Sequence, residues 1–196
     1  MKTKTLFLTL FAGAILALSP STTKAQSYQV GTNVINVGVG FGYAFNYGTG
    51  ASATPVINAS YEHGIVPLGP GFVGIGIGVG YQGSSYTYSD GFGDTWTDKW
   101  TATSFGVRGL YHLTLANEKF DLYGGIQLTY VHFGFSSTAS GPYVNSGFYT
   151  FTDPVASSFE PYFIVGGRYY FSKSIGAFAE LGYDISYFKI GLSFKF

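Results

Sequence analysis

Hydrophobic and polar positions alternate with a period of two through most of the chain from residue 34 onward, the pattern of a half-buried β-strand. In the stretch 34–45 the even positions between the apolar residues are Asn, Gly or Ala. The odd positions are all apolar: Ile35, Val37, Val39, Phe41, Tyr43 and Phe45. The alternation recurs at 57–62, 73–82, 104–112, 121–130, 159–171, 177–186 and 188–196. The sequence therefore predicts eight strands, each long enough to cross a bilayer when tilted.

The connections between these stretches alternate in length. Three of them are short or modest in length, His63–Gly71, Thr114–Lys119 and Ser172–Ser174, whereas Gly83–Lys99 and Ser136–Ser158 are predicted to be long polar loops. Bacterial outer-membrane barrels have an even number of strands, long extracellular loops and short periplasmic turns. We therefore expect an all-β fold, an eight-stranded antiparallel up-and-down transmembrane β-barrel with both termini in the periplasm.

The composition separates this barrel from a soluble β-sandwich, which would also alternate. Charged residues make up 10% of the chain, against about 25% in soluble domains. Aromatic residues reach 19% and lie at both ends of the predicted apolar face, as in the aromatic girdles of membrane barrels. Those at the short-turn end are Tyr61, Tyr111, Phe120, Tyr169, Phe171 and Phe196, and those at the loop end are Tyr43, Phe45, Tyr81, Tyr130, Phe159 and Phe188. The sandwich is the less favoured alternative, because so apolar a surface would aggregate.

The first 25 residues have the layout of a secretory signal peptide. Lys2 and Lys4 precede the apolar stretch Leu6–Leu18, and a small-residue tail ends at Ala25. The apolar stretch is too short to span a bilayer as a helix. We expect cleavage after Ala25, which leaves residues 26–196 as the mature barrel.

Charge and cysteine content exclude several classes of function. Without the three lysines of the signal peptide, seven Lys and Arg face ten Asp and Glu, a net charge of −3. This balance argues against a nucleic-acid partner. The chain contains no Cys, so neither a disulfide framework nor a lipoprotein anchor is expected.

The carboxyl terminus carries a pattern typical of outer-membrane barrels. Lys189, Gly191, Phe194 and Phe196 match the order polar-x-Gly-x-x-aromatic-x-aromatic that ends such chains. With PVINASYEHGI at 55–65 and RGLYH at 108–112, the mature chain resembles the small OmpA/OmpX-like outer-membrane β-barrel family of the Bacteroidota type. The resemblance implies a place in the outer membrane among its lipids and lipopolysaccharide. It also implies recognition of the terminal residues by the barrel-assembly machinery.

Several charged side chains are predicted to point into the narrow lumen. An eight-stranded barrel has room for side chains or one small ligand, and an unpaired buried charge is costly. We therefore expect Arg108 and Arg168 to bond to Glu62 or Glu180 in one connected plug. The alternative is a narrow conduit, for which the inward glycines at 38–42 and 74–80 would leave room. The other charged residues predicted to face inward are Asp121, Glu160, Asp184, Lys189 and Lys195.

Catalytic and metal-binding patterns are weak. His132 falls on the lipid side, where a lipid A deacylase would need a base, but Gly134 occupies the place of that family's Ser. No placed nucleophile–base pair is recognisable, so we do not expect an enzyme. The spacing of Asp90, Asp94 and Asp98 does not match an EF-hand, and no cofactor or metal is expected.

The function that the sequence favours is a non-enzymatic envelope-structural or surface-interaction role. Loops on a rigid scaffold commonly carry binding, and the two long loops contain exposed aromatic candidates for contact with an unidentified extracellular ligand. These candidates are Tyr86, Tyr88, Phe92, Trp96, Tyr143 and Tyr149. The main alternative is a narrow passive channel for small solutes, and a lipid-modifying barrel enzyme is less favoured.

Overall fold

The computed structural model describes residues 27–42, 51–89, 91–142, 144 and 149–196, with the backbone alone for 149–156. The predicted signal peptide, residues 1–25, lies outside this part of the chain. The predicted girdle residues Tyr43 and Phe45 and the loop candidate Tyr143 also lie outside it.

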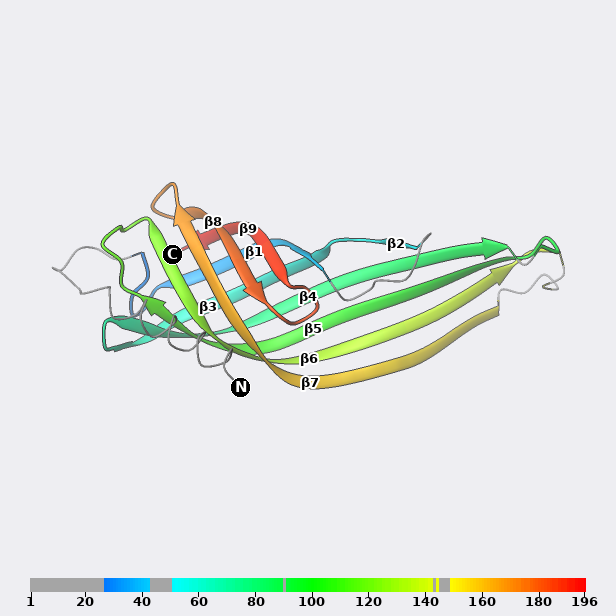
Figure 1. Ribbon diagram of the computed structural model, residues 1–196, viewed down its shortest axis with the longest axis horizontal. Coiled ribbons are helices and arrows are strands. Elements are labelled where there is room, and N and C mark those ends of the chain that lie inside the picture. Colours follow the sequence, from blue (N-terminus) through cyan, green and yellow to red (C-terminus); the bar gives the residue numbers. More distant parts are fainter. Residues whose placement is uncertain (1–26, 43–50, 90, 143, 145–148) are drawn as a thin grey trace, which may run out of the picture.

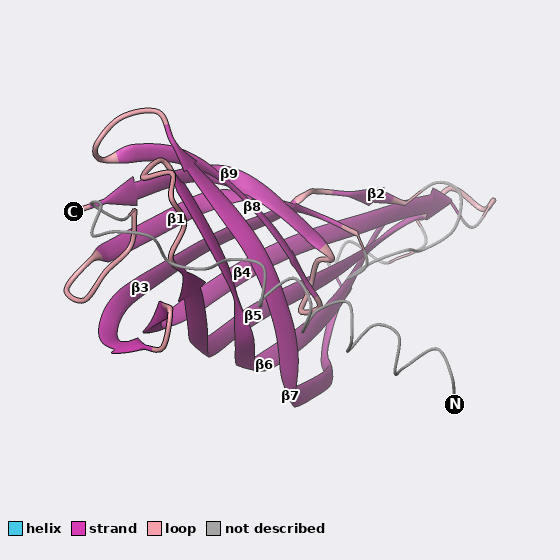
Figure 2. Cartoon of the chain, turned by 60° about the vertical axis from the view of Figure 1, so that its left-hand side comes forward, coloured by secondary structure: helices cyan, strands magenta, loops and turns pink. Residues whose placement is uncertain are grey.

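Eight strands form one antiparallel sheet that closes on itself (Figures 1 and 2). Each strand pairs with the next along the chain, and β1 pairs with β9 to close the ring. A two-residue strand, β2 (Ser52–Ala53), joins the edge of β4. The eight are β1 (Asn33–Phe41), β3 (Val56–Leu68), β4 (Gly71–Ser89), β5 (Thr95–Leu113), β6 (Phe120–Ser140), β7 (Tyr149–Tyr170), β8 (Ile175–Gly182) and β9 (Phe188–Lys195). The predicted eight-stranded antiparallel barrel is confirmed.

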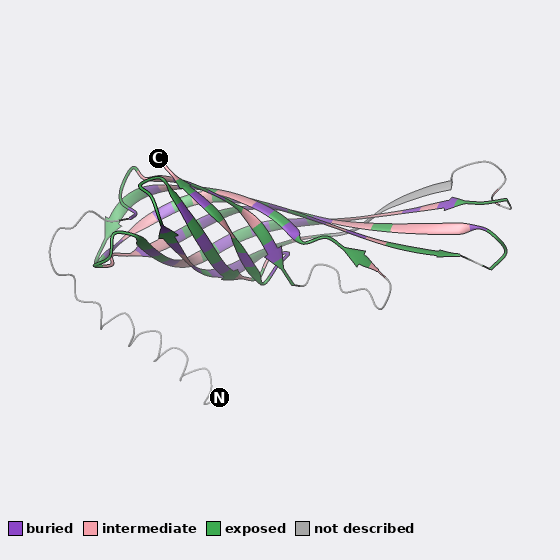
Figure 3. Ribbon diagram, turned by 90° about the horizontal axis from the view of Figure 1, so that it is seen from above, coloured by how far each residue is buried: buried purple, intermediate pink, exposed green. Residues whose placement is uncertain are grey.

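Buried and exposed positions alternate along the strands of the barrel (Figure 3). The residue types at these positions are inverted relative to a soluble barrel. Apolar side chains such as Val37, Ile77 and Leu181 point outward and are 44–60% exposed. Polar side chains between them, such as Asn36 and Thr129, are buried. An apolar exterior around a polar interior is the arrangement of a membrane barrel. No helix among the described residues is long and apolar enough to cross a membrane.

The prediction that Gly83–Lys99 and Ser136–Ser158 form long loops is wrong, because most of both segments is paired as strand. β4 and β5 stay paired out to Ser89 and Thr95, and β6 pairs with β7 as far as Ala139 and Tyr149. These segments keep a period of two, but Ser and Thr occupy the outward positions, so their polarity resembles that of a loop. A sheet outside a bilayer needs no apolar outer face, and β-branched and aromatic residues still favour strands.

The predicted connection His63–Gly71 is also mostly strand. β3 continues to Leu68, with a register shift between Gly64 and Val66, and turns at Gly69 and Pro70. Gly69 has a φ of 55°, in the left-handed region that glycine tolerates at a tight turn. The short connections 114–119 and 171–174 lie close to the predicted positions.

Four neighbouring strands extend well beyond the rest of the barrel (Figure 1). β4, β5, β6 and β7 contain 19, 19, 21 and 22 residues, whereas β1, β3, β8 and β9 contain 8–13. Crossing a bilayer takes about 9–11 residues per tilted strand. The remaining ten or so residues per strand, at about 3.3 Å each, form a sheet that projects roughly 30 Å from the barrel. We call this part, residues 83–103 and 131–158, the outer sheet.

Candidate functional site

Charged side chains gather inside the barrel, at the level of the short strands. Glu62, Arg108, Arg168 and Glu180 lie on β3, β5, β7 and β8, and each is at most 4% exposed. All four occupy inward positions of the alternation. Unpaired buried charges are costly. If these side chains pair with one another across the lumen, their contacts close it.

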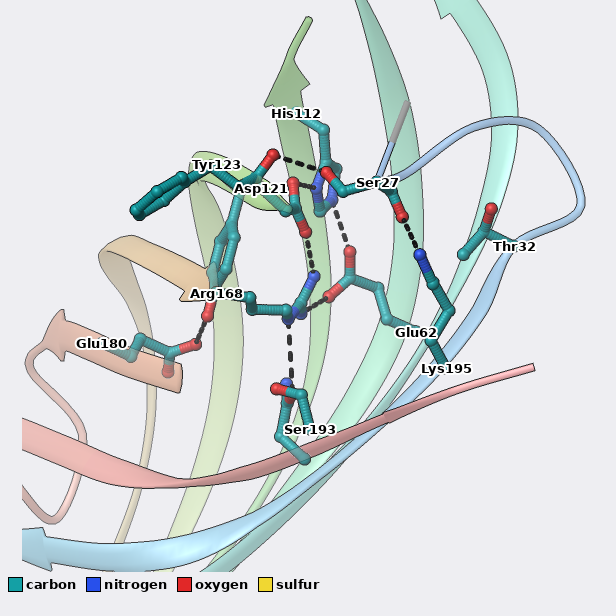
Figure 4. A network of polar contacts seen from close by, with 12 residues as sticks. Ser27, Thr32, Glu62, His112, Asp121, Tyr123, Arg168, Glu180, Ser193 and Lys195 are labelled. Carbon is teal, nitrogen blue, oxygen red and sulfur yellow. Dashed lines mark hydrogen bonds and ion pairs between the residues drawn. The ribbon is translucent and has the colours of Figure 1, made fainter. Parts of the chain in front are cut away.

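Arg168 is the centre of the largest group of contacts (Figure 4). Its Nη2 donates to Glu62 Oε2 and its Nη1 to Asp121 Oδ2, both at 2.6 Å. Its Nε donates to Asn36 Oδ1 at 3.3 Å, and its guanidinium lies 4.3 Å from the centre of the Tyr123 ring. The guanidinium therefore connects side chains from β1, β3, β6 and β7 across the lumen.

His112 closes a ring between the two carboxylates that Arg168 holds. Its Nδ1 is 2.8 Å from Asp121 Oδ1, and its Nε2 contacts Glu62 Oε1. Both ring nitrogens face carboxylate oxygens, so both donate when His112 carries two protons. Arg168 and a doubly protonated His112 then balance the charges of Glu62 and Asp121.

A second group of ion pairs lies on β5, β8, β9 and the connection between β8 and β9. Arg108 Nη2 donates to Glu180 Oε2 at 2.5 Å. Lys189 Nζ lies 3.5 Å from Glu180 Oε1 and 2.6 Å from Asp184 Oδ2. Tyr123 joins this group to the first, because its hydroxyl donates to Glu180 Oε2 at 3.2 Å while its ring lies against Arg168. Both arginines thus belong to one connected network.

The segment before β1 enters the barrel mouth on the short-turn side. Tyr28 is 3% exposed, and its ring stacks on His112 with centroids 3.6 Å apart. Ser27 Oγ donates to the Phe120 carbonyl at 2.6 Å, and Lys195 Nζ donates to the Ser27 carbonyl at 3.1 Å. Burial raises the pKa of the Tyr28 phenol, so the ring stays neutral. The residues after the predicted cleavage site therefore form part of the plug.

Inward glycines give room to bulky lumen side chains instead of leaving a conduit. A Cβ at Gly38 or Gly191 would lie within 3 Å of the Phe178 ring. A Cβ at Gly166 would lie 2.6 Å from the Tyr123 ring, and one at Gly74 would lie 2.2 Å from the Tyr28 hydroxyl. The space that these glycines leave is filled by aromatic side chains from other strands and from the segment before β1.

Little free space remains beside the ion pairs. The cavity between Arg108, Gln127, Glu180 and Lys189 has a volume of about 10 Å³, roughly the room for one water molecule. The other residues predicted to face inward differ in burial. Asp121 is 1% exposed. Lys195 is half-buried, with Nζ 4.4 Å from the centre of the Tyr170 ring, and Glu160 is exposed.

The terminal pattern lies at the seam of the barrel. Phe194 and Phe196 point outward, 38% and 66% exposed, and Phe196 exchanges two backbone hydrogen bonds with Asn33. A Cβ at Gly191 would lie 2.2 Å from the Val37 carbonyl oxygen of β1. Lys189 points inward to Glu180 and Asp184. The four residues of the pattern thus have separate places at the closing strand pair.

The outer sheet carries the remaining sequence-predicted residues. Tyr86 and Tyr88 are 37% and 40% exposed, with ring centroids 5.7 Å apart, and Phe92 in the β4–β5 turn is 79% exposed. Trp96 is half-buried opposite Tyr88. Tyr149 begins β7, and its side chain lies outside the described part.

Sequence reasoning missed a Ser–His contact on the outer surface. His132 Nδ1 lies 3.1 Å from Ser157 Oγ, which also accepts a hydrogen bond from the Tyr130 hydroxyl at 3.0 Å. Ser157 is on β7 and far from His132 in sequence, so no local motif reveals the pair. Among the described residues, no group of three His, Asp or Glu side chains is placed to hold a metal ion.

Comparison with solved structures identifies the fold. Ail, the attachment invasion locus protein of Yersinia pestis, solved with the heparin analogue sucrose octasulfate, superposes with a TM-score of 0.51 at 11% identity, over 86% of this chain and 100% of that chain. Another structure of Ail gives a TM-score of 0.39 at 12% identity, over 86% of this chain and 100% of that chain. The translocator domain of the autotransporter NalP from Neisseria meningitidis gives a TM-score of 0.36 at 12% identity, over 99% of this chain and 98% of that chain. Only the first value supports a shared fold, that of an outer-membrane β-barrel. Comparison with protein-family models and with curated proteins finds no match.

Proposed function

We propose that this protein is an integral outer-membrane β-barrel with a sealed lumen, which contacts other molecules at the cell surface through its outer sheet. One observation carries the proposal. β4–β7 continue about ten residues beyond a bilayer crossing, and they and their turn place Tyr86, Tyr88 and Phe92 at exposed positions. That sheet has no part in sealing the barrel, so contact with another surface is the role it fits best.

The placement in an outer membrane draws on several features together. The exposed outward face is apolar and has aromatic residues at both ends, which suits the lipid and lipopolysaccharide of such a membrane. The predicted signal peptide provides export, and Lys189, Gly191, Phe194 and Phe196 are the residues for the barrel-assembly machinery to recognise. The resemblance to the Bacteroidota type of small barrel agrees with this placement.

Single cysteines test location and orientation directly, because the chain has no Cys of its own. Ser140→Cys lies at the end of β6 in the outer sheet, and Ala116→Cys lies in the β5–β6 turn at the opposite end; both sites are exposed. A membrane-impermeant maleimide on intact cells should label Ser140→Cys, and should label Ala116→Cys only after permeabilisation. The reverse pattern would contradict the orientation, and a soluble periplasmic protein would contradict the location.

The ligand class expected for the outer sheet differs from that named for Ail. In the stretches 83–103 and 131–158, Lys99 is the one Lys or Arg in the sequence, against four Asp. A polyanion would need a cationic surface, whereas this sheet offers aromatic rings and hydroxyl groups. We expect no binding of sucrose octasulfate to the purified barrel by calorimetry. Micromolar binding would contradict this choice of ligand class.

The channel alternative is not favoured by the lumen contacts. Tyr28, Arg168 and Glu62 connect opposite sides of the barrel, and the cavity beside Arg108 has room for about one water molecule. A conduit for a solute would require these contacts to open.

A lipid-modifying enzyme is the second candidate, and the His132–Ser157 contact is the observation that favours it. A serine nucleophile needs an adjacent base, which this geometry provides, and usually a third group that orients the base. A fluorophosphonate probe should leave the wild-type barrel unlabelled under the main proposal. Labelling that disappears in Ser157→Ala would favour the enzyme.

A further inference from the structure

An apolar groove lies on the outside of the barrel, over β3–β6 and near the end with the short turns. It has a volume of about 1240 Å³ and is lined mostly by outward-facing side chains, with the inward-facing Arg108 and Leu110 also at its border. They include Tyr61, Leu68, Ile75, Val107, Tyr111 and Ile126. Its size exceeds the roughly 300–1,000 Å³ of ordinary small-molecule sites, so a long apolar ligand has room.

Two outward glycines form part of the floor of the groove. Gly109 on β5 and Gly124 on β6 stand where neighbouring outward positions carry Val107 and Ile126. A Cβ at Gly109 would meet nothing within 4 Å, and one at Gly124 would be in ordinary contact, 3.4 Å from the Ile164 carbonyl oxygen. The inward Gly166 differs, because the Tyr123 ring fills its space. The folded chain therefore does not use the space over Gly109.

The polar atoms at the rim of the groove have partners within the chain. The Tyr61 hydroxyl donates to Asn33 Oδ1 at 2.8 Å, and His63 Nδ1 lies 2.8 Å from the same oxygen. The Tyr111 hydroxyl donates to the Leu68 carbonyl at 3.0 Å. With these atoms satisfied, the groove suits a ligand that presents hydrocarbon to it.

We propose that this groove holds an acyl chain of an inner-leaflet phospholipid at a fixed position on the barrel. The inference rests on the proposed membrane location, which surrounds the groove with acyl chains. The groove lies near the turns at 69–70 and 114–119, on the periplasmic side of that orientation, where the leaflet is phospholipid. A second barrel is a poorer occupant, because the exposed surface that lines the groove is far smaller than the roughly 800 Å² per partner of a stable interface.

Photocrosslinking locates the bound acyl chain without altering the protein. The barrel is folded into phosphatidylcholine vesicles that contain a phosphatidylcholine with a diazirine on one acyl chain, and labelled peptides are mapped by mass spectrometry. We expect label to concentrate at Val107, Ile126 and Leu128, at least about threefold above Ile190 and Leu192 on β9, since more carbon–carbon contacts hold the chain in the groove. Equal labelling around the barrel would overturn the proposal, as would label that spares the groove.

Filling the groove provides a matched comparison. Gly109→Leu and Gly124→Leu place a side chain in the groove, whereas Gly167→Leu places one on the outer face of β7, where a Cβ meets its nearest atoms at 3.7 Å. The first two should lower labelling in the groove to the level of β9, and Gly167→Leu should leave it unchanged. Insertion is scored first by heat-modifiable migration on gels. Wild-type protein that fails to insert contradicts the proposed location, whereas an inserted barrel with unchanged labelling in Gly109→Leu contradicts the groove alone.

Discussion

Replacing Arg168 with Met should destabilise the barrel more than removing any exposed charge. Arg168 is 1% exposed and donates at 2.6 Å to both Glu62 and Asp121, which are 0% and 1% exposed. Removing one partner of a buried pair costs about 3–5 kcal/mol, mainly because the other charge stays buried. Arg168→Met leaves the Glu62 and Asp121 carboxylates buried without their shared guanidinium, so we expect a loss of about 5 kcal/mol, the upper end of that range.

The assay is equilibrium unfolding in urea of the barrel in phospholipid vesicles, followed by gel migration and tryptophan fluorescence. With a slope of about 2 kcal/mol per M, a loss of about 5 kcal/mol lowers the midpoint by roughly 2–3 M. Lys173→Met is the control, because Lys173 is exposed in the β7–β8 turn, and exposed substitutions usually change stability by at most about 0.5 kcal/mol.

A double-mutant cycle separates ion pairing from packing. Glu62→Gln removes one of the two carboxylates that Arg168→Met leaves unpaired. The double variant should therefore lose less stability than the sum of the two single losses, by about 1–3 kcal/mol. If Arg168→Met unfolds within about 0.5 M of the wild type, near the Lys173→Met control, the two carboxylates are hydrated. The inference of a closed lumen would then be refuted.

Three further substitutions test other parts of the barrel. Gly191→Ala should lower the assembled amount measured by heat-modifiable migration, because its Cβ would lie 2.2 Å from the Val37 carbonyl oxygen. The control, Gly109→Ala, places its Cβ in open space and should assemble normally. Equal assembly of the two variants would contradict the close approach of β1 and β9 at Gly191. Tyr28→Ala should cost about 3–5 kcal/mol in the urea assay through the cavity that it leaves beside His112, and no loss would show that the segment is dispensable. Phe196→Asp should reduce the outer-membrane yield in cell fractions, because a charge replaces an outward aromatic residue, and an unchanged yield would count against the terminal pattern.

The strands within the bilayer could be predicted because the lipid imposes an apolar residue at every second position. The same rule predicted that Glu62, Arg108, Arg168 and Glu180 point inward. It failed for the outer sheet, where the outward face is polar and Thr97 or Thr101 occupies an outward position. There the period of two persists, but the contrast in hydrophobicity that marks a membrane strand is lost.

The contacts across the lumen depend on the closed ring. Asp121 pairs with Arg168 between neighbouring strands, but Arg168 on β7 reaches Glu62 on β3 across the barrel, and the register that places them follows from how all eight strands are staggered. Tyr28 precedes the first alternating stretch, so no periodicity indicates its burial. The inward glycines were equally compatible with a conduit or a filled lumen. The pattern of glycines along a strand does not show whether an aromatic side chain from elsewhere in the chain fills the space beside them.

The closed lumen is the central claim about this barrel, and single-channel recording of the wild-type protein in planar phospholipid bilayers tests it most directly. Insertion is established beforehand by heat-modifiable migration of the same sample. We expect no steady conductance from the wild type, and rare or small openings from Tyr28→Ala, because Tyr28 covers His112 at the barrel mouth. Steady ohmic conductance from inserted wild-type protein would contradict the sealed barrel and favour the passive channel.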